Sequence, residues 1–273
     1  MAMRGREMSD TGNSAGGGAE TPRSRSAEGG AFEATASEGE GRPEMVPDLG
    51  IIMLDTTFPR IPGDVGNPAT FPFPVHYEVV EGASPRRVVR EADPALLSPF
   101  IEAARKLERM GVRAIGTSCG FLAIFQRELA GAVTVPVLSS SLLQVAPAAR
   151  NMAEGRRVGI LTACGRSLTD RHLAGVGVER SAVAIMGMED APEFTAVFLE
   201  GKGEIDVARC RREVVAAARR MADGNPDLGA VVLECTNMPP YAAAVQEALG
   251  LPVYDVVTLL SHARSVAVRE PFG

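Results

Sequence analysis

The sequence lacks several features that would assign a function at once. Its 273 residues carry a net charge of −6 and no basic stripe, so we expect no nucleic-acid partner. No apolar run approaches the roughly 18 residues of a membrane span, and the N-terminus has no apolar core of a signal peptide. The four cysteines show no pairing pattern, which is typical of a reducing compartment. These absences predict a cytoplasmic protein without a membrane partner.

Metal-binding and nucleotide-binding motifs are missing as well. His76, His172 and His262 are scattered, without His-x-x-x-His or Cys-x-x-Cys spacing. We therefore predict no metal site. No phosphate-binding loop of the form Gly-x-x-x-x-Gly-Lys-Ser/Thr occurs either.

Residues 1–46 differ in composition from the rest of the chain. They are rich in Gly, Ser, Glu, Ala and Arg, and they bury too little apolar surface to offset the entropy of ordering. We predict a disordered tail over 1–46, and we expect its deletion to leave folding and activity intact. The remaining chain, about 225 residues, is long enough for two α/β units that share a cleft.

Two segments of this remaining chain repeat one pattern. An apolar stretch leads to Cys119 in GVRAIGTSCG, and another leads to Cys235 in GAVVLECTNM. A Pro-Val pair follows each cysteine at the same spacing of 17 positions, first at Pro136 and then at Pro252. This order of strand, cysteine, helix and further strand predicts a duplicated α/β unit with one thiol in each copy.

The predicted fold class is α/β, with two similar flavodoxin-like domains that are related by a pseudo-twofold axis. Each domain is a doubly wound, mainly parallel sheet. The first domain comprises 47–148 plus 254–273, and the second comprises 149–253. Residues 60–74, rich in Pro and Gly, form a shaped loop that can line the site. The expected strands are 49–54, 75–80, 112–117, 133–138, 157–162, 182–186, 230–233 and 253–257, and the expected helices are 94–110, 121–129 and 203–221.

The candidate site lies where these strands end. In open parallel sheets, ligands bind beyond the carboxyl ends of the strands, and helix N-termini at this edge lower the pKa of a thiol. Hydroxyls, amides and backbone N–H groups beside the two cysteines suit a carboxylate. Two of the candidates, Asp55 and Asn67, also fit a role as turn formers. The candidate substrate-binding residues are Asp55, Asn67, Thr117, Ser118, Gly120, Thr162, Thr236 and Asn237.

Two thiols related by pseudo-symmetry fit cofactor-independent racemisation. One thiolate removes a proton from a carbon acid, and the opposite thiol delivers a proton to the other face. Donors that bind the substrate carboxylate also stabilise the enediolate-like charge that develops. We therefore expect Cys119 and Cys235 to exchange the roles of base and acid, with no cofactor.

The motifs Gly-Thr-Ser-Cys-Gly at Cys119 and Leu-Glu-Cys-Thr-Asn-Met-Pro at Cys235 resemble those of the aspartate/glutamate racemase superfamily. Its members include amino-acid and hydantoin racemases, maleate isomerases and arylmalonate decarboxylases. The resemblance covers residues 49–273. It implies that the two cysteines are the catalytic pair, and that Thr162, Thr236 and Asn237 bind the substrate.

Three positions differ from the amino-acid racemases of this superfamily. Gly120-Phe121 follows the first cysteine, where Asn-Thr is usual, and Glu234 precedes the second, where Gly is usual. Asn237 stands where many glutamate racemases have His. We interpret Glu234 as a surface or salt-bridge residue that raises the pKa of the thiol if it lies close. These differences leave the substrate open.

The leading hypothesis is a racemase or epimerase of a small carboxylate-bearing substrate, with a homodimer as a possible assembly. The alternatives are an enzyme similar to maleate isomerase, hydantoin racemase or arylmalonate decarboxylase, and a family member that binds a small carboxylate without turnover. A Cys–His hydrolase with His172 or His262 as base is a further alternative, although it gives no role to the second thiol. Cys210 is interpreted as a packing residue, and Cys164 is left open between packing and the site.

Overall fold

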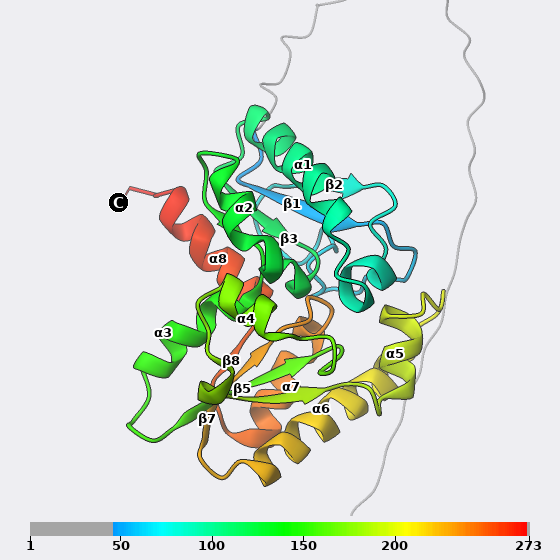
Figure 1. Ribbon diagram of the computed structural model, residues 1–273, viewed down its shortest axis with the longest axis vertical. Helices are drawn as coiled ribbons and strands as arrows, with labels where there is room; N and C mark the ends of the chain where they lie inside the picture. Colours follow the sequence, from blue (N-terminus) through cyan, green and yellow to red (C-terminus); the bar gives the residue numbers. More distant parts are fainter. Residues whose placement is uncertain (1–45, 272–273) are drawn as a thin grey trace, which may run out of the picture. The chain divides into compact units, whose positions relative to one another are not determined.

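The computed structural model describes residues 46–271 of the chain (Figure 1). Apart from Val46, the predicted tail lies outside the described residues. Within 46–271, none of the helices combines the length and the apolar character that a bilayer span requires.

Two parallel four-stranded sheets form the core of residues 46–271, and they share one topology. The first sheet has the strand order β2-β1-β3-β4, and the second has the order β6-β5-β7-β8. Every pairing between neighbouring strands is parallel. The strands are β1 (Leu49–Leu54), β2 (Val75–Val80), β3 (Ala114–Thr117), β4 (Val137–Leu138), β5 (Arg157–Thr162), β6 (Val183–Gly187), β7 (Leu228–Leu233) and β8 (Val253–Tyr254). The matching orders confirm the predicted α/β fold of two similar halves.

Helices connect the consecutive strands from β2 onward, whereas a loop without a helix joins β1 to β2. Short 3₁₀ turns precede several of them, among them Gly120–Phe125 directly after Cys119 and Pro239–Tyr241 shortly after Cys235. The α-helices are α1 (Leu97–Arg109), α2 (Gln126–Gly131), α3 (Val145–Arg150), α4 (Asp170–Gly175), α5 (Pro192–Phe198), α6 (Val207–Gly224), α7 (Ala242–Leu249) and α8 (Val256–Ala267).

The last helix, α8, packs against the first sheet although it follows the last strand of the second. Leu260 of α8 lies over Gly116 of β3, and a side chain at that glycine would come within 2.7 Å of the leucine. Leu260 shares a small buried cluster with Leu49 and Ile51 of β1. In Figure 1, α8 accordingly lies next to the first sheet, near β3. The chain thus crosses back to its first half after β8.

Several predicted elements have different bounds in the structure. Strand 133–138 shortens to β4, because Pro136 has no N–H and Thr134 bonds the Glu108 carboxylate instead of a strand. The predicted helix 121–129 divides into a 3₁₀ turn and α2. Helix 203–221 begins later, at α6, because Asp206 caps it by accepting from the Arg209 N–H. Strand 253–257 ends at β8 because Asp255 caps α8.

Candidate active site

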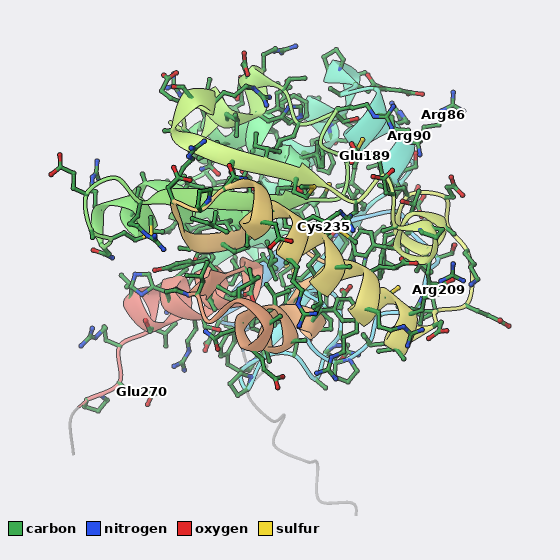
Figure 2. All side chains as sticks on the ribbon, turned by 90° about the horizontal axis from the view of Figure 1, so that it is seen from below. Arg86, Arg90, Glu189, Arg209, Cys235 and Glu270 are labelled. Carbon is green, nitrogen blue, oxygen red and sulfur yellow. The ribbon has the colours of Figure 1, made fainter. Side chains whose placement is uncertain are left out.

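Cys119 and Cys235 lie at equivalent places in the two sheets. Each follows the strand at the third position of its sheet, β3 or β7, and each thiol residue is only 8% exposed. Both line one partly enclosed pocket. In Figure 2, Cys235 lies toward the middle of the molecule, whereas Arg86 and Glu270 point outward. The duplication therefore brings one thiol from each half to the same place.

The walls of this pocket combine a ring of apolar side chains with a few charged and polar groups. They come from the end of β1 and the loop after it, from the segment after β2, from α5 and its end, and from the turns after β3, β5 and β7. The residues in the wall are Leu54, Thr56, Phe58, Arg60, Pro85, Val89, Ser118, Cys119, Gly120, Phe121, Ala163, Phe198, Leu199, Glu234, Cys235, Thr236 and Asn237.

The Cys119 thiol has a raised pKa, which corrects the expectation that the following helix lowers it. Burial raises the pKa most, and the negative charge of Glu234 raises it further. The backbone N–H groups of Phe121 and Leu122 act in the expected direction and lower the pKa. Removal of the thiol from water outweighs these two donors, because an anion in an apolar pocket loses its hydration.

The Cys235 thiol also has a pKa well above its ordinary value, from burial first and Glu234 second. Its Sγ donates to Oδ1 of Asn237 at 3.5 Å. The amide Nδ2 of Asn237 donates in turn to Oδ2 of Asp64 at 2.7 Å. Asp64 lies in the loop after β1, so the second thiol is held by a group from the first half of the chain.

Arg60 places a positive charge in the pocket wall. Its guanidinium donates to Asp64 at 2.7 Å and to Thr56 at 2.9 Å, and it lies 4.8 Å from the centre of the Phe58 ring. These contacts hold the side chain in one orientation. Residues 60–74 thus supply a wall group in Arg60 and a supporting group in Asp64.

Glu234 corrects a prediction made from the sequence. We expected a surface or salt-bridge residue, but the side chain is fully buried and makes no salt bridge within the described residues. Its Oε2 accepts from the Thr162 hydroxyl at 2.7 Å, while Oε1 has no hydrogen-bond partner there. Burial raises the pKa of Glu234 to about 7. The conditional part of the prediction agrees with this geometry, since Glu234 raises the pKa of both thiols.

Gly120 makes room for that carboxylate. A Cβ atom at this position would stand 2.2 Å from Oε1 and 2.3 Å from the backbone oxygen of Glu234. Both distances are far below a normal contact, so no larger residue fits without movement of the backbone. Gly120 and Glu234, two of the positions at which the chain differs from amino-acid racemases, therefore touch each other across the two halves.

Four of the eight candidate substrate-binding residues line the pocket, namely Ser118, Gly120, Thr236 and Asn237. Two of them also join the halves, because the Thr236 hydroxyl donates to the Ser118 carbonyl oxygen at 2.6 Å. The Ser118 hydroxyl accepts from the Leu54 N–H at 2.8 Å. These hydrogen bonds position the turns that carry the thiols, and a direct role in binding stays a prediction.

The other four candidates lie outside the wall. The Thr162 hydroxyl donates to Oε2 of Glu234 at 2.7 Å. The Thr117 hydroxyl donates to the Ser139 carbonyl oxygen at 2.6 Å. Asp55 is exposed and accepts from the Gly82 N–H at 3.0 Å. Asn67 bonds the backbone of its own loop at Arg60 and Ala69. The geometry gives these residues structural contacts rather than access to the pocket.

The remaining cysteines and histidines do not line the pocket. Cys164 lines a neighbouring hollow with Arg90 and Glu189, and Cys210 is buried in α6. His172 is buried at the start of α4, against Phe121, and His262 is exposed on α8. Across the described part of the chain, no three His, Cys, Asp or Glu side chains form a group that could hold a metal ion.

Sequence reasoning missed several wall residues, chiefly Phe58, Arg60, Phe198 and Glu234. The sequence pattern around Glu234 could have indicated a place in the site, because a charged residue follows an otherwise apolar strand immediately before a cysteine. Arg60 had a weaker one, as a cation in a Pro- and Gly-rich loop. Phe198 had none, because it reaches the pocket from α5, which the sequence does not link to either thiol.

The fold and the pocket define a class of α/β proteins whose two matching halves each place one thiol in a shared pocket. The chain belongs to the Asp/Glu/Hydantoin racemase family, whose model matches residues 78–263. This confirms the resemblance inferred from the cysteine motifs and places the chain in a family of enzymes.

Among its relatives is dimethylsulfoniopropionate lyase 7 of Emiliania huxleyi (strain CCMP1516), 34% identical over 240 residues that cover 83% of this chain and 69% of that protein. A dimethylsulfoniopropionate lyase of Durusdinium sp. clade D is 31% identical, covering 77% and 71%. Unliganded arylmalonate decarboxylase has the same fold, with a TM-score of 0.54 and 19% identity over 82% of this chain and 94% of that one.

Proposed function

We propose that the protein is a lyase that eliminates dimethyl sulfide from dimethylsulfoniopropionate. The observation that carries the proposal is the pair of buried thiols, Cys119 and Cys235, in one small pocket of a chain similar to two lyases of that name. The substrate is a small zwitterion with a carboxylate at one end and a sulfonium group two carbons away. Its C2 hydrogens are activated by the carboxylate only weakly, so their removal needs a strong, well-placed base.

The elimination requires one proton acceptor. One of the two thiols, as the thiolate, takes a proton from C2, and the C–H electron pair forms the C2–C3 double bond. The C3–S bond breaks, and its electron pair leaves with sulfur as neutral dimethyl sulfide. Acrylate remains, and the thiol later returns its proton to solvent. A thiolate of raised pKa is a stronger base, which suits a carbon acid.

Arg60 supports the placement of the substrate carboxylate. Its guanidinium lines the same pocket as the thiols and is held rigidly by Asp64 and Thr56. A fixed guanidinium offers N–H donors in the geometry that a carboxylate prefers. The surrounding apolar side chains Phe58, Phe121 and Phe198 exclude water, which strengthens these interactions.

The test is proton NMR of the reaction mixture with dimethylsulfoniopropionate as substrate. The wild type is expected to produce dimethyl sulfide and acrylate, while Cys119→Ala and Cys235→Ala each lose the activity. Cys164→Ala is the matched control, because Cys164 lines a different hollow. A folded wild type that leaves the substrate unchanged would refute the proposal.

Two-thiol racemisation of a small carboxylate is the second candidate. It is favoured by the equivalent positions of the thiols in the two sheets and by their proximity, since the charge of Cys119 raises the pKa of Cys235. Both reactions begin with removal of a proton beside a carboxylate. They differ in the second step, which is protonation from the opposite face in a racemase and loss of a leaving group in a lyase.

Deuterium exchange separates the two candidates. In D2O, a racemase removes the Cα–H signal from both enantiomers of its substrate, and either cysteine substitution abolishes this. Aspartate, glutamate, a hydantoin, maleate and an arylmalonate form the panel, because the last two also test the isomerase and decarboxylase alternatives. Stabilisation of the fold by a carboxylate without any turnover would instead indicate a binding protein.

A further inference from the structure

Glu234 belongs to the wall of the thiol pocket, and one oxygen of its carboxylate has no hydrogen-bond partner among the described residues. Oε2 accepts from Thr162, whereas Oε1 has no partner among the described residues, although the side chain is 0% exposed. Oε1 lies in the space directly above Gly120, which is itself part of the pocket wall. A buried carboxylate oxygen without a hydrogen bond is costly, and a positive charge placed beside it would stabilise its ionised form.

The charge of this carboxylate is also uncompensated. Arg60 is a cation in the same wall, but its guanidinium is already paired with Asp64 at 2.7 Å. No Lys, Arg or His of residues 46–271 forms a salt bridge with Glu234. Buried charges in proteins are normally paired. When it is ionised, Glu234 is therefore an anionic group in this pocket without a counter-charge.

We propose that Glu234 is the specificity-determining residue that binds the positively charged centre of the substrate. On this assignment, which rests on the proposed function, the pocket selects small carboxylates that carry a sulfonium or quaternary ammonium group. Such a centre has no N–H to donate, so it is recognised by charge and by contact with aromatic faces. Phe58, Phe121 and Phe198 line the pocket and supply such faces.

The two ends of a zwitterion then meet opposite charges. The carboxylate end is directed to Arg60, and the cationic end to Glu234. This division places the hydrogens between the two ends near the thiols, because Cys119 and Cys235 line the same pocket as Arg60 and Glu234. A carboxylate of the same shape whose other end is uncharged gains only the interaction with Arg60.

The test compares two probes that differ in one atom. 3-(Trimethylammonio)propanoate and 4,4-dimethylpentanoate have the same shape, and only the first carries a positive charge. Binding of each to the full chain is measured by titration calorimetry, without turnover. The wild type is expected to bind the cationic probe at least about 10-fold more tightly.

Three variants show whether Glu234 is responsible. Glu234→Gln keeps the size and the hydrogen bond from Thr162, and we expect it to lose the preference for the cationic probe. Glu234→Asp keeps the charge and is expected to retain the preference. Glu189→Gln is the matched control, because Glu189 lines the neighbouring hollow and is labelled in Figure 2. Its preference is expected to equal that of the wild type.

The outcomes separate this inference from the lyase proposal. Equal binding of both probes to the wild type, or a preference that persists in Glu234→Gln, would overturn the role of Glu234 even if dimethyl sulfide is produced. A preference that depends on Glu234 in a protein that releases no dimethyl sulfide would uphold that role and refute the lyase.

Discussion

Glu234 is the residue whose protonation state sets the charge of the pocket. Burial raises its pKa to about 7, so the side chain changes charge near neutral pH. Both thiols have raised pKa values partly because of this carboxylate. A positive charge bound at Glu234 would lower all three pKa values together, so a cationic substrate itself would favour formation of the thiolate.

The raised pKa of Glu234 predicts a pH-dependent loss of stability. Between its ordinary value of 4.5 and about 7, the native state holds a proton that the unfolded state has released. Stability from this group is therefore present below pH 4.5 and falls as the pH rises to 7. Relative to Glu234→Gln, the free energy of unfolding of the wild type should fall by on the order of 3 kcal/mol across this window.

The pKa shift of His172 changes stability with pH in the opposite direction to that of Glu234. The wild type must therefore be compared with Glu234→Gln, which retains His172. Burial lowers its pKa from 6.5 to about 4, and its contribution is lost as the pH falls through that range. His172 is present in both proteins and cancels in the difference. Urea denaturation at several pH values between 4.5 and 8 measures the two curves. Parallel curves would show that Glu234 is ionised throughout.

The turn after β3 is the element in which packing most tightly restricts the choice of residue. Cys119 is extended, and Gly120 begins a 3₁₀ turn in contact with Glu234 from the turn after β7. The two turns meet without space between them. Packing at this junction, rather than intrinsic helix propensity, therefore fixes which residue is accepted at position 120.

Gly120→Ala is expected to destabilise the protein by about 2–3 kcal/mol and to remove activity. The added Cβ would stand 2.3 Å from the backbone oxygen of Glu234, which cannot rotate away. Gly131→Ala in α2 is the control, since a Cβ there meets nothing within 4 Å. Thermal unfolding and an activity assay measure both variants, and wild-type behaviour of Gly120→Ala would contradict the contact.

The elements themselves could be predicted largely from the sequence, whereas the pocket wall could be predicted only in part. The repeated apolar stretches before Cys119 and Cys235 indicated parallel strands, because buried strands in such sheets are apolar throughout. The errors were in the bounds of elements such as the strand expected at 133–138. There, Pro136 and the Glu108 carboxylate prevent the strand from starting at 133. Glu234 was misjudged because its burial depends on Gly120, which lies 114 positions away in the chain. No local pattern carries that information.

At the scale of the whole described unit, the site is also the place where the two halves join. The Thr236 hydroxyl bonds the Ser118 carbonyl, and Asn237 bonds Asp64, so hydrogen bonds cross between the halves beside both thiols. The return of α8 to the first sheet adds a second connection at Leu260. Stability and catalytic geometry are consequently coupled through the same few contacts.

This coupling predicts different effects for two threonine substitutions of similar cost. Thr236→Ala leaves the buried Ser118 carbonyl without this donor and should cost ~1–3 kcal/mol of stability, with a loss of at least ~10-fold in activity because the thiols shift. Thr258→Ala removes one of the two hydrogen bonds of the capping box of α8 and should cost ~1 kcal/mol with little change in activity. Chemical denaturation and product formation are measured for both. Equal activity losses would show that global stability alone is responsible.

The Glu234 carboxylate has one more consequence if acrylate is the product. Acrylate is an electrophile that alkylates thiolates, so a cysteine enzyme that releases it risks inactivating itself at each turnover. After elimination, the cationic leaving group has become a neutral sulfide, and the charge of Glu234 again opposes ionisation of both cysteines. The thiol that has just taken the proton keeps it while acrylate departs. On the proposed function, the residue that binds the cationic end of the substrate would thus also protect the enzyme from its own product.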